Sequence, residues 1–377
     1  MPPVRRPIPL VLSVCALIGA VTALPIMAAA QSSEPGARAR APAPTPPPTS
    51  RRTLSRPVED NAGTLSKESQ PDGIVPSAGV QLYERMGATL PPLPPEKPYT
   101  GQIDEAYGDY QRGLYETALS KALTKASAGD AASQTLVATM MMRGFGIKRD
   151  AKTAAFWYRQ AAERGDPPAM FEYALLLMSG RYVEQDKKKA DDFMHKAAEA
   201  GNSSAQFNWG QIVVSENPGE RGLQLALPYY EKSAEQGVAD AQYAVAQLYN
   251  TLKGLAPEKK SQARYWLERA AKAGFDTAQL DMGLWYVNGV AGPQDYDKGF
   301  QWMRIAAYRG NVVAQNKLAH LYVEALGTRP DPVEAAKWYV LSRRAGLQDP
   351  YLEDFYLGIE DDQQKQAIDR ANKFRRG

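Results

Sequence analysis

One stretch of sequence recurs every 36 residues through most of this 377-residue chain, with a single step of 37. Its clearest marker is a glycine that follows an alanine-rich helical pattern, as in Trp157-Tyr158…Ala161-Ala162-Glu-Arg-Gly165. These glycines are Gly129, Gly165, Gly201, Gly237, Gly274, Gly310 and Gly346. A fixed period of this length predicts a solenoid, in which one supersecondary unit stacks on the next.

Other columns of the repeat keep the same register. A small residue stands three positions before most of these glycines, from Ala126 to Ala307, and the pattern lapses only at Arg343. An aromatic residue stands eight positions before, at Trp157, Phe193, Tyr229, Trp266, Trp302 and Trp338. Such spacing predicts an amphipathic helix whose aromatic column packs between helices, and which the glycine ends with φ > 0. A polar residue after the glycine can cap the next helix. The predicted unit is helix, turn, helix.

The motif itself resembles a known repeat. Ala278-Gln279…Met282-Gly283…Tyr286…Gly289-Val290…Asp295, together with the segment ending at Gly165, is similar to the Sel-one-like repeat (SLR), a relative of the tetratricopeptide repeat. The resemblance covers 101–346 and implies an all-α, right-handed superhelical solenoid with the first helices on its concave side. The turns at Asn217-Pro218-Gly219 and Leu252-Lys253-Gly254 depart from the motif, so we expect them to have different shapes.

The chain divides into five parts by composition. Residues 1–30 are typical of a signal peptide, and 31–100, which hold half of the 28 prolines, predict a disordered linker. Within that linker, 79–95 either serves as spacer or docks on the solenoid or a partner. Residues 101–128 predict a degenerate helix pair, 129–345 six repeats, and 346–377 capping helices with a polar outer face.

The predicted signal gives an expected location. Arg5 and Arg6 precede an apolar stretch that ends at Ala28-Ala29-Ala30, a small-residue cleavage site. We therefore expect export to the periplasm, with an uncleaved membrane anchor as the alternative. Cleavage there also removes Cys15, the only cysteine, which excludes disulfides and cysteine-based metal sites from the mature chain.

The sequence offers little for chemistry. We expect no cofactor, no metal and no catalytic residues, because the two histidines, His195 and His320, lie several repeats apart and no catalytic motif accompanies them. The net charge of +3 is spread without a basic stripe, which argues against nucleic acid as a partner.

The surface of the first helices is the remaining candidate for function. With the Ala-Gln alanine of each first helix as position one, positions three, seven and ten point away from the helix-pair core. Those positions are largely apolar and predict a partner-binding groove on the concave side. Its residues are Phe171, Leu175, Met178, Phe207, Gln211, Tyr243, Gln247, Leu280, Leu284, Asn316 and His320. The alternative is that curvature buries these positions against the neighbouring repeat.

The sequence thus predicts a non-enzymatic scaffold for protein or peptide partners. The resemblance extends to exported bacterial SLR proteins, some of which regulate envelope functions, and implies a role in the cell envelope. Two alternatives stay open: a cell-wall-fragment binder or envelope enzyme, and a secretory-pathway quality-control adaptor.

Overall fold

The computed structural model describes residues 104–374. The predicted signal peptide, 1–30, and the predicted linker, 31–100, lie outside the described residues. Every regular element from 104 to 374 is a helix and none is a strand, so the all-α prediction is confirmed. The described helices are α3(Glu105–Gln111), α4(Tyr115–Ser127), α5(Ala131–Arg143), α6(Ala151–Glu163), α7(Pro167–Ser179), α8(Lys187–Glu199), α9(Ser203–Glu216), α10(Glu220–Glu235), α11(Ala239–Thr251), α12(Pro257–Ser261), α13(Ala263–Lys272), α14(Asp276–Asn288), α15(Tyr296–Tyr308), α16(Val312–Val323), α17(Pro332–Arg344), α18(Pro350–Gly358) and α19(Asp361–Lys373).

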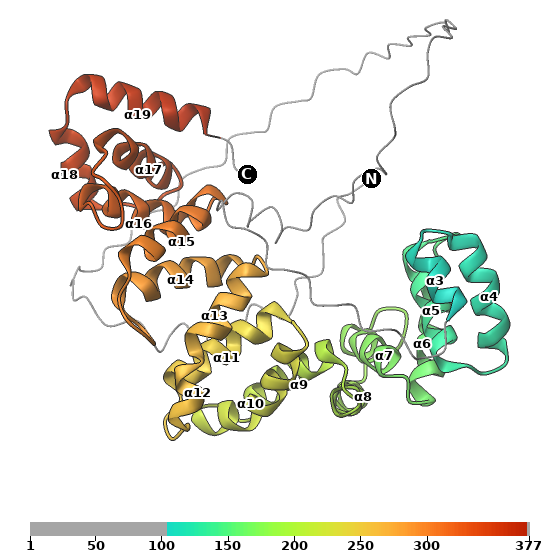
Figure 1. Cartoon of the computed structure of the whole chain (residues 1–377). Coiled ribbons are helices and arrows are strands. Elements are labelled where there is room, and N and C mark those ends of the chain that lie inside the picture. The colour runs from blue at the N-terminus through green and yellow to red at the C-terminus, as the bar shows by residue number, and fades with distance from the viewer. Residues whose placement is uncertain (1–103, 375–377) are drawn as a thin grey trace, which may run out of the picture. The chain divides into compact units, whose positions relative to one another are not determined.

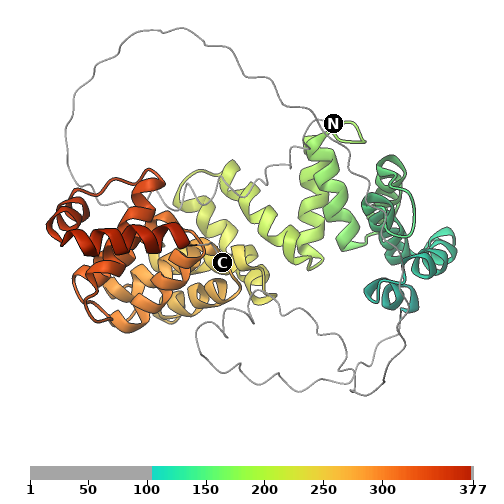
Figure 2. The ribbon, with the colours of Figure 1, turned by 90° about the horizontal axis from the view of Figure 1, so that it is seen from above.

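Helices that are neighbours in the sequence are also neighbours in space. The first helix of each repeat packs on the second, and the second packs on the first helix of the next repeat (Figures 1 and 2). The first helices are α5, α7, α9, α11, α14 and α16; the second helices are α6, α8, α10, α13, α15 and α17. This arrangement is a solenoid of helix-turn-helix units, as the 36-residue period predicts.

The repeat glycines make the turns between units. Gly165 has φ +90 and Gly237 has φ +95, a left-handed conformation that glycine adopts without strain. The residue after the glycine then caps the following helix in several repeats. For example, the side chain of Asp166 accepts a hydrogen bond from the backbone N–H of Ala169, and Asn311 caps α16 in the same way.

The small-residue column lies in the core. The alanines three positions before the repeat glycines, from Ala126 to Ala307, are at most 3 % exposed, and they let adjacent helices approach closely. The tryptophans predicted to lie between helices do so in three cases: Trp266, Trp302 and Trp338 are buried. Trp157 is only half-buried.

In five of the six repeats a buried glutamine bonds the helix pair to the one before it. Nε2 of Gln206 donates to the carbonyl of Ala198, and Nε2 of Gln242 donates to that of Ala234. The same bond, eight residues back, recurs at Gln134, Gln279 and Gln315. The repeat 167–202 has Met170 at this position. The bond explains why Ala-Gln recurs in the motif: the amide reaches a carbonyl at the end of the preceding helix.

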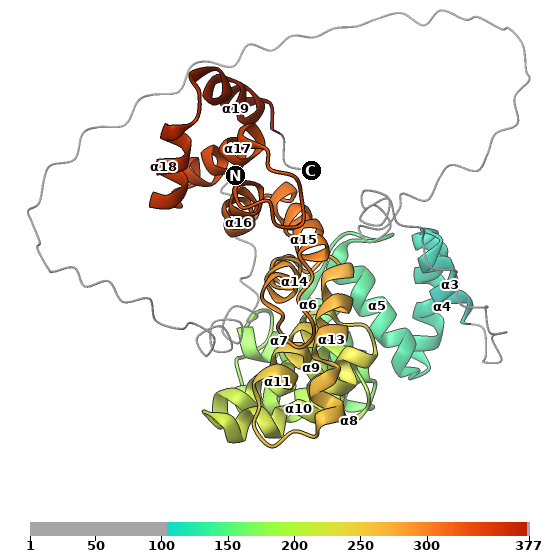
Figure 3. The same ribbon diagram turned by 60° about the vertical axis from the view of Figure 1, so that its left-hand side comes forward.

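The two turns that depart from the motif have different structures. After α9 the chain turns at Asn217 and Gly219, and α10 begins without a side-chain cap. After α11 a short extra helix, α12, precedes α13. At the C-terminal end, α18 and α19 both pack on α17 (Figure 3).

Candidate functional site

The predicted groove residues divide into two sets. Five are buried, so the prediction that these residues form an open apolar strip along the groove is wrong for them: Phe207, Gln211, Tyr243, Gln247 and Asn316. Six are half-buried: Phe171, Leu175, Met178, Leu280, Leu284 and His320. For Tyr243, Gln247 and Asn316, contacts between successive first helices account for the burial, which is the alternative that the sequence left open.

One of these contacts joins α11 to α14. The hydroxyl of Tyr243 and Nε2 of Gln247 both donate to Oδ2 of Asp281, at 2.9 and 2.8 Å. Burial raises the pKa of Asp281, and the two hydrogen bonds partly offset that effect. Tyr243 and Gln247 therefore link repeats and are not free to contact a partner.

A second contact joins α16 to α18. Nδ2 of Asn316 donates to Oδ2 of Asp349 at 3.0 Å, and Nε2 of His320 lies 2.8 Å from the same oxygen. The His320 ring also stacks on Tyr351, with 5.2 Å between ring centroids. Burial favours the neutral form of Asp349, but hydrogen bonds from His320, Asn316 and the Leu352 amide outweigh this and lower its pKa. His320 is thus part of a helix-docking contact.

The remaining apolar positions of the strip serve packing as well. The Phe207 ring lies 5.6 Å from the Tyr230 ring on α10. Leu280 and Leu284 pack against the core formed by the last repeats. Leu280 and Leu284 therefore contribute to packing between units, whereas Phe207 packs on the second helix of its own repeat.

The strip stays partly open on α7. Phe171, Leu175 and Met178 pack against the core of the second and third repeats but remain half-buried. Met142 on α5 and Trp209 on α9 also border that core and are half-buried. Glu172 is the only charged residue of the helix, so α7 is apolar nearly all round. A helix with that pattern is usually buried on every side.

An aromatic cluster at the N-terminal end was not predicted as a surface. The Tyr115 ring stacks on Phe145 at 4.7 Å, and Tyr110 lies beside both. Next to them Tyr107 is 52 % exposed and Leu114 is 50 % exposed. The tyrosines at 107, 110 and 115 are visible in the sequence, but their exposure depends on packing that the sequence pattern does not specify.

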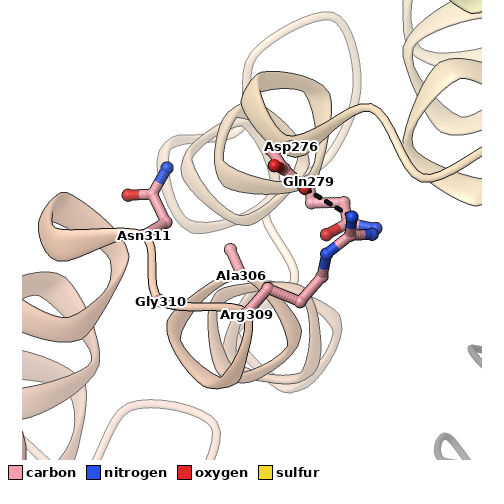
Figure 4. Close-up of a pocket in the computed structure, with 6 residues that line it drawn as sticks. All are labelled: Asp276, Gln279, Ala306, Arg309, Gly310 and Asn311. Carbon is pink, nitrogen blue, oxygen red and sulfur yellow. Dashed lines mark ion pairs between the residues drawn. The ribbon is translucent and has the colours of Figure 1, made fainter. Parts of the chain in front are cut away.

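A small polar cavity of about 140 Å³ lies where α14, α15 and the start of α16 meet (Figure 4). It is lined by Asp276, Gln279, Ala306, Arg309, Gly310 and Asn311. An ion pair of 2.7 Å joins Arg309 to Asp276 across it. Gln279 is fully buried, and its Oε1 has no hydrogen-bond partner among the described residues. Sequence reasoning missed this site because its residues are ordinary members of the repeat.

Residues 104–374 contain no cluster of three or more side chains suited to a metal ion. The other histidine, His195, lies on an exposed surface. Its ring stacks on that of Trp209 with 4.5 Å between centroids, and its Nε2 is 3.4 Å from the Tyr229 hydroxyl. In the same range, none of the helices combines the length and apolar character needed to span a bilayer.

Comparisons with curated proteins give two short matches. The chain is 28 % identical over 85 residues to "Chitin synthase regulatory factor 3" of Schizosaccharomyces pombe. It is 31 % identical over 107 residues to "Chitin synthase regulator SKT5" of Saccharomyces cerevisiae. The matches cover 22 % and 28 % of this chain but only 9 % and 15 % of those relatives.

Solved structures include two that are more extensively similar. One is c5321, a protective antigen of uropathogenic Escherichia coli with an SLR fold: TM-score 0.58, 25 % identity, 72 % of this chain and 59 % of that chain covered. The other is a Sel1 repeat protein from Oxalobacter formigenes: TM-score 0.53, 28 % identity, 65 % of this chain and all of that chain covered.

The family model for the Sel1 repeat matches six times, and its boundaries follow the helix pairs described above. The matched residues are 131–166, 167–202, 203–238, 239–275, 277–311 and 312–347. The matches begin at the residue where each first helix begins, or one residue later, and end just past the repeat glycine. Together they cover more than half of the chain, which therefore belongs to the Sel1 repeat family.

Proposed function

We propose that this protein is an exported scaffold that binds another protein through the apolar surface of α7. The Sel1-repeat fold is typical of non-catalytic scaffolds for protein–protein interaction, which supports a protein partner. The predicted signal peptide motivates the proposed site of action, the periplasmic side of a bacterial envelope.

The observation that carries the proposal is the incomplete burial of α7. Its buried face, including Tyr173 and Leu177, completes the core, yet Phe171, Leu175 and Met178 remain half-buried on the other side. On α11 and α16, by contrast, the same positions are closed by hydrogen bonds to Asp281 and Asp349. Apolar positions that are covered on α11 and α16 but remain partly exposed on α7 indicate an interaction site on α7.

The chemistry of the surface indicates the kind of partner. Phe171, Leu175 and Met178 are spaced i, i+4 and i+7, so they form one ridge along the helix. A ridge of this kind fits the apolar side of a partner helix, and the methionine can adjust its shape to the partner. The partner is therefore a protein segment with apolar side chains at helical spacing.

The names of the curated relatives agree with this class of function. Both are named as regulators of chitin synthase, and regulation of an enzyme is a role that a protein-binding scaffold can perform. Because the matches cover only a small part of those relatives, nothing further about their function is transferred to this chain.

Affinity capture from the envelope fraction tests the proposal. We expect the wild-type chain to retain a defined partner and the double variant Phe171→Ser, Leu175→Ser to lose it. The matched control is Tyr265→Ser with Leu225→Ser, which alters exposed apolar residues on second helices instead. Equal capture by wild type and the α7 variant contradicts the proposal. Localisation is tested separately: recovery of the native chain in the cytoplasm alone contradicts the export part.

A further inference from the structure

The cavity at Gln279 has a filled counterpart elsewhere in the same chain. In the repeat 203–238, the equivalent glutamine is Gln206, and its Nε2 makes the same bond to the preceding helix. There, however, Oε1 of Gln206 accepts a hydrogen bond of 2.8 Å from Nε2 of Gln236. Gln236 is the residue directly before the repeat glycine Gly237. Its carboxamide therefore provides Gln206 with the hydrogen bond that Gln279 lacks.

Arg309 is the residue at the position of Gln236 in the repeat 276–311, directly before Gly310. Its guanidinium pairs with Asp276 at 2.7 Å and makes no hydrogen bond to Gln279 among the described residues (Figure 4). The repeat 203–238 has Ser203 at the position of Asp276, so no carboxylate competes there. Asp276 thus holds the guanidinium of Arg309, and Oε1 of Gln279 has no hydrogen-bond partner among the described residues.

The lining of the cavity selects its ligand by charge. Asp276 and Arg309 neutralise each other, and Gln279, Ala306, Gly310 and Asn311 carry no charge. A charged ligand would lose its water without gaining a counter-charge, which costs free energy. A neutral polar group needs only hydrogen bonds to offset its desolvation. The ligand has to donate to Oε1 of Gln279, which is a pure acceptor, and it can accept from Arg309, which has N–H groups beyond those facing Asp276.

We propose that this cavity is a binding site for a neutral amide group. The N–H of the amide donates to Oε1 of Gln279, and its carbonyl accepts from the guanidinium of Arg309. The Gln236 carboxamide shows that the repeat accommodates such a group at this place. The cavity volume of about 140 Å³ is roughly ten times what one buried water needs, so an amide fits with space for its flanking atoms.

The proposal is independent of the α7 surface, because the cavity lies between α14, α15 and α16. An amide at this site could come from an Asn or Gln side chain or from a peptide bond of a bound protein. Acetamide and N-methylacetamide represent these two sources. Acetone is the matched control, since it has the size of acetamide and a carbonyl but no N–H.

The experiment is an NMR titration of the full-length chain, with the Gln279 side-chain amide and the backbone amides of Gly310 and Asn311 as reporters. We expect saturable shifts with acetamide, with a dissociation constant on the order of 1–10 mM for so small a ligand. Acetone should give no saturable shift. A stronger response to N-methylacetamide assigns the site to peptide bonds, and a stronger response to acetamide assigns it to side chains.

Two variants make the test specific. Arg309→Gln should abolish the response, because the new carboxamide can bond Gln279 as Gln236 bonds Gln206. Gln236→Ala should create a second acetamide-responsive site, reported by the Gln206 side chain. The proposal is overturned if acetamide gives no saturable shift at Gln279, if acetone shifts the same signals equally, or if both variants respond as wild type does.

Discussion

The hydroxyl of Tyr243 donates a hydrogen bond to Oδ2 of Asp281 across the boundary between two repeats, at 2.9 Å. This bond places Tyr243 in the interface between α11 and α14, although its helical position matches that of Phe171 on α7. Two residues at the same position of the repeat thus have different roles: one closes the solenoid and the other remains half-buried.

That difference predicts unequal effects on stability. Tyr243→Ser removes a buried ring and its hydrogen bond and should lower the free energy of unfolding by about 3–5 kcal/mol. Phe171→Ser should cost only about 1–2 kcal/mol, because that ring is only partly buried and makes no hydrogen bond to another repeat. Urea denaturation followed by circular dichroism measures both. Equal losses would show that α7 is packed as tightly as α11.

The two carboxylates between repeats predict opposite pH dependences. The lowered pKa of Asp349 means that its contribution to stability is present above the unfolded pKa of about 4 and is lost as pH falls through the lower folded pKa. Asp349→Asn should therefore destabilise the protein at pH 7 and progressively less toward acid. Urea midpoints at about pH 7 and about pH 3.5 measure this.

The raised pKa of Asp281 predicts a pH dependence of stability with the opposite sign. Its neutral form is favoured in the folded state, so its contribution is present below the unfolded pKa and is lost as pH rises through the folded pKa. Asp281→Asn keeps an acceptor for Tyr243 and Gln247 but removes the charge. We expect this variant to gain stability relative to wild type between about pH 3.5 and pH 7. The same sign of pH dependence for both variants would contradict the assigned environments.

The aromatic column gives a test of the repeat register. Trp266 is 7 % exposed, whereas its neighbour Tyr265 is 54 % exposed. Trp266→Ala should cost about 3–5 kcal/mol, and Tyr265→Ala, the control, should stay within about 0.5 kcal/mol of wild type. Thermal or urea unfolding distinguishes them, and an unchanged midpoint for Trp266→Ala would refute the register.

The glutamine bond between helix pairs is also measurable. Gln242→Met has a similar volume but cannot donate to the Ala234 carbonyl, so it should lower stability by about 1 kcal/mol. Gln224→Met on the exposed side of α10 is the control, with an expected change of less than about 0.5 kcal/mol. If the two variants lose the same stability, the buried bond contributes nothing beyond packing.

The fold could be predicted from the sequence because the residues that define each helix and turn recur in several copies. The glycines, the alanine columns and the tryptophans recur in register, and six copies identify the helix faces that pack. Trp157 is the exception among the tryptophans of the aromatic column, since it is half-buried whereas Trp266, Trp302 and Trp338 are buried.

The candidate site was predictable only in part. Helical geometry places Phe171 and Tyr243 on the same side of their helices, but the approach of the next repeat decides which is covered. That approach depends on single residues such as Asp281 and Asp349, which belong to no column of the repeat. The cavity at Gln279 is likewise lined by Asp276 and Arg309, an ion pair that follows from no column of the repeat.

The most direct test of the scaffold account is site-specific photocrosslinking in intact cells. A photoreactive phenylalanine analogue is placed at Phe171 on α7 and, as a control, at Tyr265 on α13, which is exposed but outside the proposed surface. The account predicts a discrete crosslinked adduct with an envelope protein from position 171 and none from position 265. Adducts from position 265 with none from position 171 would contradict it.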